Sequence, residues 1–251
     1  MLKLMKYELR KTWFTKVILL AVTAAAEAFF LYGLYGEKED MAAGGAFILF
    51  LLAFCGVVAI GLESVITLHR DMNTKQSHML FMTPNSSYKI LGAKVLECSI
   101  SILLAGAFFF AIGALDLSLV FAKEGELGQL WKQVREFISR FSINGRQITI
   151  DLPTMATLAF NLLASWIALI TSAYLADVIS AALLNGKKMN GVISFVLFLV
   201  INWGITRLTV LLTASITENM TAMLVSGCID LVFAAVMYYV TALIMDRHLS
   251  V

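Results

Sequence analysis

The chain has 251 residues, of which 60% are hydrophobic and only 14% are charged, with a formal net charge of +2. Soluble domains carry about 25% charged residues, and a soluble domain of this size has too little interior to bury so many apolar side chains. The composition excludes a soluble protein and predicts an integral membrane protein. The small net charge gives no reason to expect a nucleic-acid partner.

The first 16 residues are predicted to form an interfacial helix that precedes the membrane. Their apolar side chains share one helical face: Leu2, Met5, Leu9 and Trp13. The neighbouring stripe is basic: Lys3, Lys6 and Arg10. Such a stripe suits anionic lipid headgroups, although a basic flank that only orients the first span explains it equally well. Because the apolar run continues to Tyr35, we expect the start to be an uncleaved span and not a signal peptide.

Six apolar stretches are long enough to cross a bilayer, whose core of about 30 Å requires about 20 helical residues. They cover residues 17–36, 41–68, 90–115, 154–184, 191–217 and 220–245. An even number of spans places both termini on one side, and Lys and Arg concentrate in the segments on that side. We therefore predict a single all-α domain, residues 1–251, with six transmembrane helices and both termini cytoplasmic.

Residues 69–89, between the second and third spans, mix charged residues with an apolar patch from Met79 to Met82. Thr83 precedes Pro84, which disfavours helix at Thr83, so we expect a short cytoplasmic helix to end there. Methionine and aromatic side chains adapt well to a partner groove, which favours a docking surface. A hairpin loop packed on its own bundle is the alternative.

Residues 116–153 form the longest break in hydrophobicity and are expected to be extracellular. Within this segment apolar residues recur on one helical face: Leu127, Leu130, Trp131, Val134, Phe137, Ile138 and Phe141. We predict an amphipathic helix on the outer membrane surface, either an interfacial anchor or a lid over an exit pathway. The dipeptide Asn144-Gly145 predicts a tight turn in a small hairpin.

Ionisable residues inside the spans are functional candidates, because burying them in a bilayer is unfavourable. They are Glu27, Glu63, Lys94, Glu97, Asp177, Arg207 and Asp230. The four that lie toward the cytoplasmic ends fit an interfacial polar cluster better than a proton relay. Lys94 and Glu97 are three residues apart on one helical face, so we predict an ion pair between them.

The remaining three charges lie deeper and are candidates for a pairing between helices. Counted from the outer ends at 1.5 Å per residue, Arg207, Asp230 and Glu27 lie at similar depths. Their opposite charges predict that Arg207 pairs with Asp230 or with Glu27.

The sequence carries no recognisable catalytic or metal-binding pattern. Its three cysteines, Cys55, Cys98 and Cys228, lie singly within apolar runs and suit packing. The segment before Gly186-Lys187 lacks the first glycine of a phosphate-binding loop, so ATP binding by that route is not expected. We predict no catalytic, cofactor or metal site, and therefore no enzyme acting alone.

Two segments carry a resemblance to a known family. The opening LKLMKYELRKT (residues 2–12) and the loop running from Arg70-Asp71 to KQSHMLFMTP (residues 75–84), together with six spans, resemble the permease subunits of bacterial type-two ABC exporters. The resemblance implies a connecting elbow helix over residues 1–15 and a coupling helix over residues 71–82. The docking residues it implies are Arg70, Asp71, Lys75, His78, Met79, Leu80, Phe81 and Met82. The elbow residues it implies are Lys3, Lys6, Arg10 and Trp13.

The resemblance also implies partners and a location. Two permease chains, expected to be a homodimer, would assemble with two ABC ATPase subunits in the bacterial cytoplasmic membrane. ATP and Mg²⁺ would bind to the ATPase, and this chain would hold no cofactor. We expect it to move an apolar or amphipathic substrate out of the cell, such as a peptide toxin, an antimicrobial peptide, a drug or a lipid-like molecule.

One departure from that family concerns the outer side. Well-known members often have re-entrant helices between the last two spans, whereas here residues 213–220 form a short connection and the long outer segment joins spans three and four. The competing function is a self-sufficient transporter driven by an ion gradient, with the intramembrane carboxylates as carriers. Duplicated halves would favour that function, and no convincing repeat relates spans one to three to spans four to six.

Overall fold

The computed structural model describes residues 2–73, 86–123, 142–143, 146–147, 152–184, 190–216 and 218–248. The described helices are α1 (Leu2–Lys11), α2 (Trp13–Tyr35), α3 (Glu39–Asn73), α5 (Ser87–Lys123), α7 (Leu152–Leu184), α8 (Asn190–Thr213) and α9 (Asn219–His248). All of these except α1 are long and apolar enough to cross a membrane. The six predicted spans are therefore confirmed as helices. The length and composition of these helices are those of a multi-pass membrane protein with a helical bundle.

Several helices extend beyond the predicted apolar stretches. The second stretch, predicted as 41–68, is a helix of 35 residues, and the third, predicted as 90–115, is a helix of 37 residues. Hydropathy detects only the part of a helix that lies in lipid, and the polar turns at each end continue the same backbone hydrogen bonding. The segment predicted to leave the membrane at residue 116 is therefore still helical up to Lys123. The predicted amphipathic helix over residues 127–141 lies outside the described residues.

A two-residue antiparallel pairing confirms the small predicted hairpin. Strand β1 (Ser142–Ile143) pairs with β2 (Arg146–Gln147), with Ser142 opposite Gln147 and Ile143 opposite Arg146. This register leaves two residues between the strands, as the Asn-Gly dipeptide predicts.

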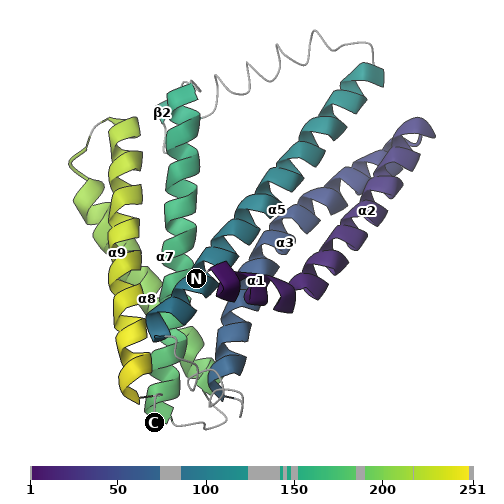
Figure 1. Cartoon of the computed structure of the whole chain (residues 1–251). Coiled ribbons are helices and arrows are strands. Elements are labelled where there is room, and N and C mark those ends of the chain that lie inside the picture. The colour runs from purple at the N-terminus through teal and green to yellow at the C-terminus, as the bar shows by residue number, and fades with distance from the viewer. Residues whose placement is uncertain are drawn as a thin grey trace.

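The helical conformation is interrupted at Thr12, between α1 and α2. The Thr12 hydroxyl donates to the backbone carbonyl of Glu8 at 3.2 Å, and the Thr12 side chain is buried. A side chain that bonds the preceding turn competes with continued helix and bends the backbone. As a result α1 is a separate helix that packs across α5, and α2 begins at Trp13 (Figure 1).

Helices α2 and α3 form a tight hairpin that depends on glycine. A Cβ on Gly33 would lie 2.5 Å from the Ala42 backbone nitrogen, and one on Gly45 would lie 2.7 Å from the Phe30 Cα. Small residues allow helix backbones in a membrane to approach closely. Figure 1 shows α2, α3 and α5 leaning away from α7 and α9 toward one end of the bundle.

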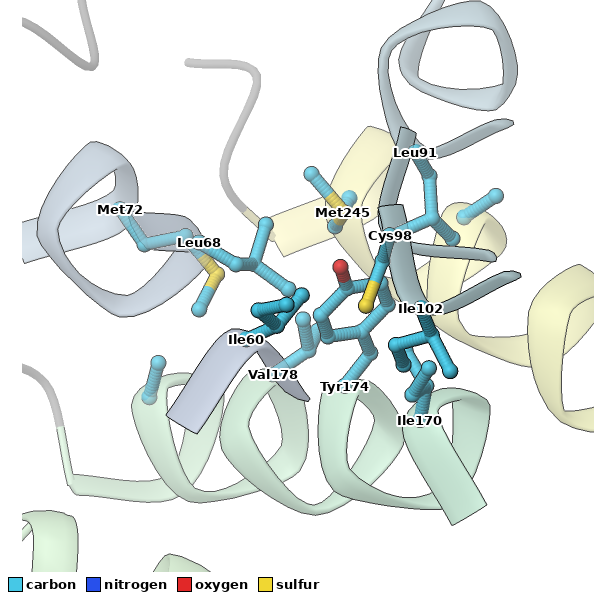
Figure 2. Close-up of a cluster of buried hydrophobic side chains, with 12 residues drawn as sticks. Ile60, Leu68, Met72, Leu91, Cys98, Ile102, Ile170, Tyr174, Val178 and Met245 are labelled. Carbon is cyan, nitrogen blue, oxygen red and sulfur yellow. The ribbon is translucent and has the colours of Figure 1, made fainter. Parts of the chain in front are cut away.

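The core lies at the other end, where α3, α7 and α9 finish and α5 begins. It joins these four helices through a set of buried side chains: Ile60, Leu68, Met72, Leu91, Cys98, Ile102, Ile170, Tyr174, Val178, Ala181, Ala242 and Met245. Figure 2 shows Tyr174 from α7 lying between Ile60 of α3 and Cys98 of α5. The Tyr174 and Ser64 hydroxyls share a hydrogen bond within this core. This end of the bundle is therefore the place where the two groups of helices are joined.

Candidate functional site

Charged side chains from four helices meet beside the core and form what we call the α1 junction. Its members are Glu8 and Lys11 of α1, Lys16 of α2, Asp71 of α3, and Lys94 and Glu97 of α5. The three acidic residues match the three basic ones, so the junction is neutral when all six are charged. Buried charges are tolerated in proteins when they are paired in this way.

Lys94 lies at the centre of the junction. Its side chain is 2% exposed, and its Nζ lies 2.7 Å from Asp71 Oδ2 and 3.0 Å from Glu8 Oε1. The other Asp71 oxygen accepts a hydrogen bond from Lys11 Nζ at 2.5 Å. Lys94 therefore connects α1 to the last turn of α3. The predicted pair between Lys94 and Glu97 is wrong, because Lys94 bonds carboxylates of other helices.

Glu97 forms the second part of the junction. Its Oε1 accepts hydrogen bonds from Lys16 Nζ at 2.6 Å, from Ser101 Oγ at 2.9 Å and from Thr12 Oγ1 at 3.1 Å. Glu97 is 5% exposed, so these bonds replace the water that the carboxylate loses on burial. The break at Thr12 is what brings that hydroxyl to Glu97, since a continuous helix would carry α1 away from α5.

The junction includes one residue that the sequence placed in the docking loop. Asp71 is 7% exposed and lies inside α3, with both carboxylate oxygens bonded to lysines. Asp71 thus connects helices inside the chain, whereas the neighbouring Arg70 side chain is exposed. The remaining predicted docking residues, Lys75, His78, Met79, Leu80, Phe81 and Met82, lie outside the described residues. The junction therefore includes the beginning of the predicted docking loop.

Three of the predicted elbow residues line one groove. Lys6, Arg10 and Trp13 surround a hollow of about 530 Å³ together with Leu9. The Trp13 side chain is 66% exposed, as expected for an aromatic ring at a lipid headgroup region. Lys3 lies in α1, and its side chain lies outside the described residues.

A second polar site lies at one end of an apolar cavity between α3, α7 and α8. The cavity has a volume of about 520 Å³. Its walls include Leu62, Trp166, Leu169, Phe195 and Phe198. Its polar groups are His69, Asp177 and Ser194. An apolar cavity with a few convergent polar groups is typical of a small-molecule site.

Asp177 is the most buried charge of this cavity. The side chain is 3% exposed, and its Oδ1 lies 2.7 Å from His69 Nδ1 and 3.5 Å from Ser194 Oγ. When Asp177 is ionised it only accepts hydrogen bonds, and the proton of this contact then belongs to His69 Nδ1. The other oxygen, Oδ2, is buried without a hydrogen-bond partner among the described residues. Asp177 therefore keeps an unused acceptor beside an apolar space.

The deeper charges do not form the predicted pairs. The Arg207 guanidinium lies over the Trp203 ring, 5.7 Å from its centroid. Asp230 Oδ2 instead accepts a hydrogen bond from Ser165 at 2.6 Å. Within the described part of the chain, no ion pair joins Arg207 to Asp230 or to Glu27, so this prediction is wrong. The exposed Arg207 side chain instead makes a cation–π contact with an aromatic residue four positions earlier in the same helix.

Glu27 lies near another acidic residue. Its side chain lies beside that of Asp116 in α5, and one oxygen of each carboxylate is buried without a hydrogen-bond partner among the described residues. A second contact between α2 and α5 is made by Lys123 Nζ of α5, which donates to the Leu34 backbone carbonyl near the end of α2. No group of three or more His, Cys, Asp and Glu residues in the described ranges is arranged to hold a metal ion.

The comparisons with known proteins leave the family open. Neither a protein-family model, nor a curated protein, nor a solved structure matches this chain. Function is therefore inferred from the six apolar helices, the α1 junction and the cavity at Asp177.

Proposed function

We propose that the chain is the permease subunit of an ATP-driven exporter of the type-two ABC class. In this proposal both termini and the loop over residues 74–85 face the cytoplasm of a bacterial cell, α1 is the elbow helix, and a second copy completes the transport path. The loop docks on a separate ABC ATPase, which binds and hydrolyses ATP. This chain supplies the path and the preference for an apolar or amphipathic substrate.

The observation that carries the proposal is the bridge from Lys11 through Asp71 to Lys94. Asp71 lies two residues before the end of α3, so it is the last buried charge of that helix before the loop. Through Asp71, a displacement of the loop would act on α1 and α5 at once, because both lysines bond the same carboxylate. Such a discrete, bonded connection is what transmits movement between a docking surface and a bundle.

The apolar cavity supports the substrate class. It opens between helices of the first and second halves of the chain, α3 on one side and α7 and α8 on the other. Only a few polar groups interrupt its walls, which suits an apolar or amphipathic guest better than a sugar or a nucleotide.

Purification of the tagged chain from its native host in a mild detergent tests the proposal. We expect an ABC ATPase to accompany the native chain and to be lost when Met79, Leu80 and Phe81 are changed to serine. The matched control changes three polar residues of the same loop, Thr74, Gln76 and Ser77, to alanine, and should retain the ATPase. An ATPase that is absent from all three preparations contradicts the proposal.

A gradient-driven transporter is the second candidate, and the unpartnered oxygens of Glu27 and Asp177 favour it. Such a protein would transport without a partner when reconstituted in vesicles with an imposed proton or sodium gradient. Transport that needs the gradient and no ATPase, and that stops on changing Glu27 to glutamine, would assign this function instead.

A further inference from the structure

The cavity between α3, α7 and α8 combines two features that the α1 junction lacks: empty space and an unsatisfied charge. Every carboxylate of the junction bonds at least one lysine. Asp177 bonds a histidine and a serine, and its Oδ2 bonds nothing in the described chain. A buried acceptor without a partner is unfavourable by about 1–3 kcal/mol, and more for a charged group. Within the described residues, the Asp177 carboxylate therefore lacks one donor.

The chemistry of that donor follows from the surroundings. Apart from His69, the described residues that line the cavity include no basic side chain, so among them only an imidazole faces the negative charge of Asp177. An ammonium group supplies both a positive charge and N–H donors. In a site with little water, the attraction between such opposite charges is several times stronger than in bulk solvent.

The walls define the rest of the ligand. Trp166 and Leu169 of α7 and Phe195 and Phe198 of α8 present aromatic and aliphatic surface along the cavity. The Phe195 and Phe198 rings stack with centroids 6.5 Å apart, which gives a continuous aromatic wall. Aromatic walls attract the charge of an organic cation through their ring faces. They also provide apolar surface for the rest of the ligand.

We infer that this cavity binds an amphipathic primary amine, with the ammonium group beside the Asp177 carboxylate and the apolar body against Trp166, Phe195 and Phe198. As the identity of the exported substrate, this inference rests on the proposed function. The binding of an amine to this cavity can be tested separately, by a measurement that needs neither ATP nor the partner ATPase.

The experiment measures binding of dansylcadaverine, a fluorescent amine with an apolar ring system and a primary ammonium. The purified full-length chain is placed in nanodiscs of phosphatidylcholine, and the dansyl emission is titrated against protein-free discs. We expect saturable binding that weakens at least tenfold when Asp177 is changed to asparagine. The N-acetylated form of the probe, which lacks the charge, should bind at least tenfold more weakly than dansylcadaverine to the native chain.

Two further variants separate the site from general effects on folding. Asp230→Asn removes another carboxylate of the spans that lies outside the cavity lining, and should change the affinity less than twofold. Ala173→Phe keeps Asp177 and fills the cavity, and should abolish binding even if Asp177→Asn fails to fold. Equal affinity in the native and Asp177→Asn chains, or equal binding of the acetylated probe, overturns the inference.

Discs that contain phosphatidylethanolamine distinguish a soluble amine from a lipid with the same headgroup chemistry. Unchanged probe affinity in those discs supports a soluble guest, whereas loss of binding overturns that assignment and gives the site to the lipid. Binding without an associated ATPase would refute the exporter alone. An associated ATPase without binding would refute the amine site alone.

Discussion

The α1 junction and the cavity at Asp177 are both polar sites buried at the same end of the bundle, yet they differ in how their charges are balanced. In the junction, three carboxylates meet three lysines over distances of 2.5–3.0 Å. In the cavity, one carboxylate meets a histidine, and its other oxygen has no hydrogen-bond partner in the part of the chain that the structure describes. A network in which every charge is paired can be tolerated inside the folded chain. A buried carboxylate that lacks a full set of donors suits an added ligand that donates. The contrast distinguishes the α1 junction, a connection between helices, from the cavity, for which we propose binding.

The largest expected effect comes from removing the centre of the junction. Lys94→Met leaves Glu8 and Asp71 buried without their shared cation, and breaking a buried pair in this way is unfavourable by about 3–5 kcal/mol. We expect a loss of that size in the free energy of unfolding, measured by titration with SDS in mixed micelles. The triple variant Glu8→Gln, Asp71→Asn, Lys94→Met should recover most of the loss. A single variant as stable as the native chain would break the comparison.

A contact without charge gives a scale for that effect. Gly45→Ala places a methyl group 2.7 Å from the Phe30 Cα, so α2 and α3 must separate, and overpacking of this kind destabilises by about 1–3 kcal/mol. Gly44→Ala is the matched control, because nothing lies within 4 Å of its Cβ and alanine favours helix. We expect the SDS midpoint to fall for the first variant only. Equal midpoints would mean that the hairpin is not closely packed.

The hydroxyl pair between the two sites should behave like an ordinary buried hydrogen bond. Tyr174→Phe removes the partner of Ser64 inside the core, and a buried hydroxyl left unbonded is unfavourable by about 1–3 kcal/mol. The double variant Tyr174→Phe, Ser64→Ala removes both polar groups and should lie closer to the native stability. A double variant less stable than either single one would show that the two hydroxyls act independently.

The smallest expected effect on stability is at the cavity. Asp177→Asn keeps the shape of the side chain and removes a buried charge that lacks a full set of partners. Its free energy of unfolding should therefore change by less than about 1 kcal/mol, even though amine binding is lost. Glu97→Gln provides the comparison, because the Glu97 carboxylate bonds Lys16. We expect the Glu97→Gln chain to be clearly less stable than the Asp177→Asn chain. Equal losses in the two variants would erase the difference between the sites.

The sequence predicts the number and type of the long helices because about 20 consecutive apolar residues have no other stable form in a bilayer. It predicts their ends less well, since Asp71 and Lys123 are polar and still helical. The sequence does not predict which charges pair between helices, because the pairing depends on how the helices pack. The spacing of Lys94 and Glu97 suggests a local pair, but the approach of α1 provides Glu8, and the last turn of α3 provides Asp71.

The same limit applies to the cavity. Asp177 stands out as a charge within a span, but its partner His69 is 108 residues away and was assigned to a loop. The break at Thr12 is a further feature that no periodicity indicates, because the apolar stripe of residues 2–13 continues through it. Sequence patterns identify which residues are unusual, and the packing of helices decides which of them meet.

The length of α3 has a mechanical consequence. Its 35 residues extend over about 50 Å at 1.5 Å per residue, well beyond the bilayer core of about 30 Å. The lysines that hold Asp71 fix one end of this rod, and Gly45 binds its other half closely to α2. A rotation of about 10° around Asp71 would displace the far end by roughly 8 Å, and would carry α2 with it. A small angular change at one membrane surface thus becomes a large translation at the other.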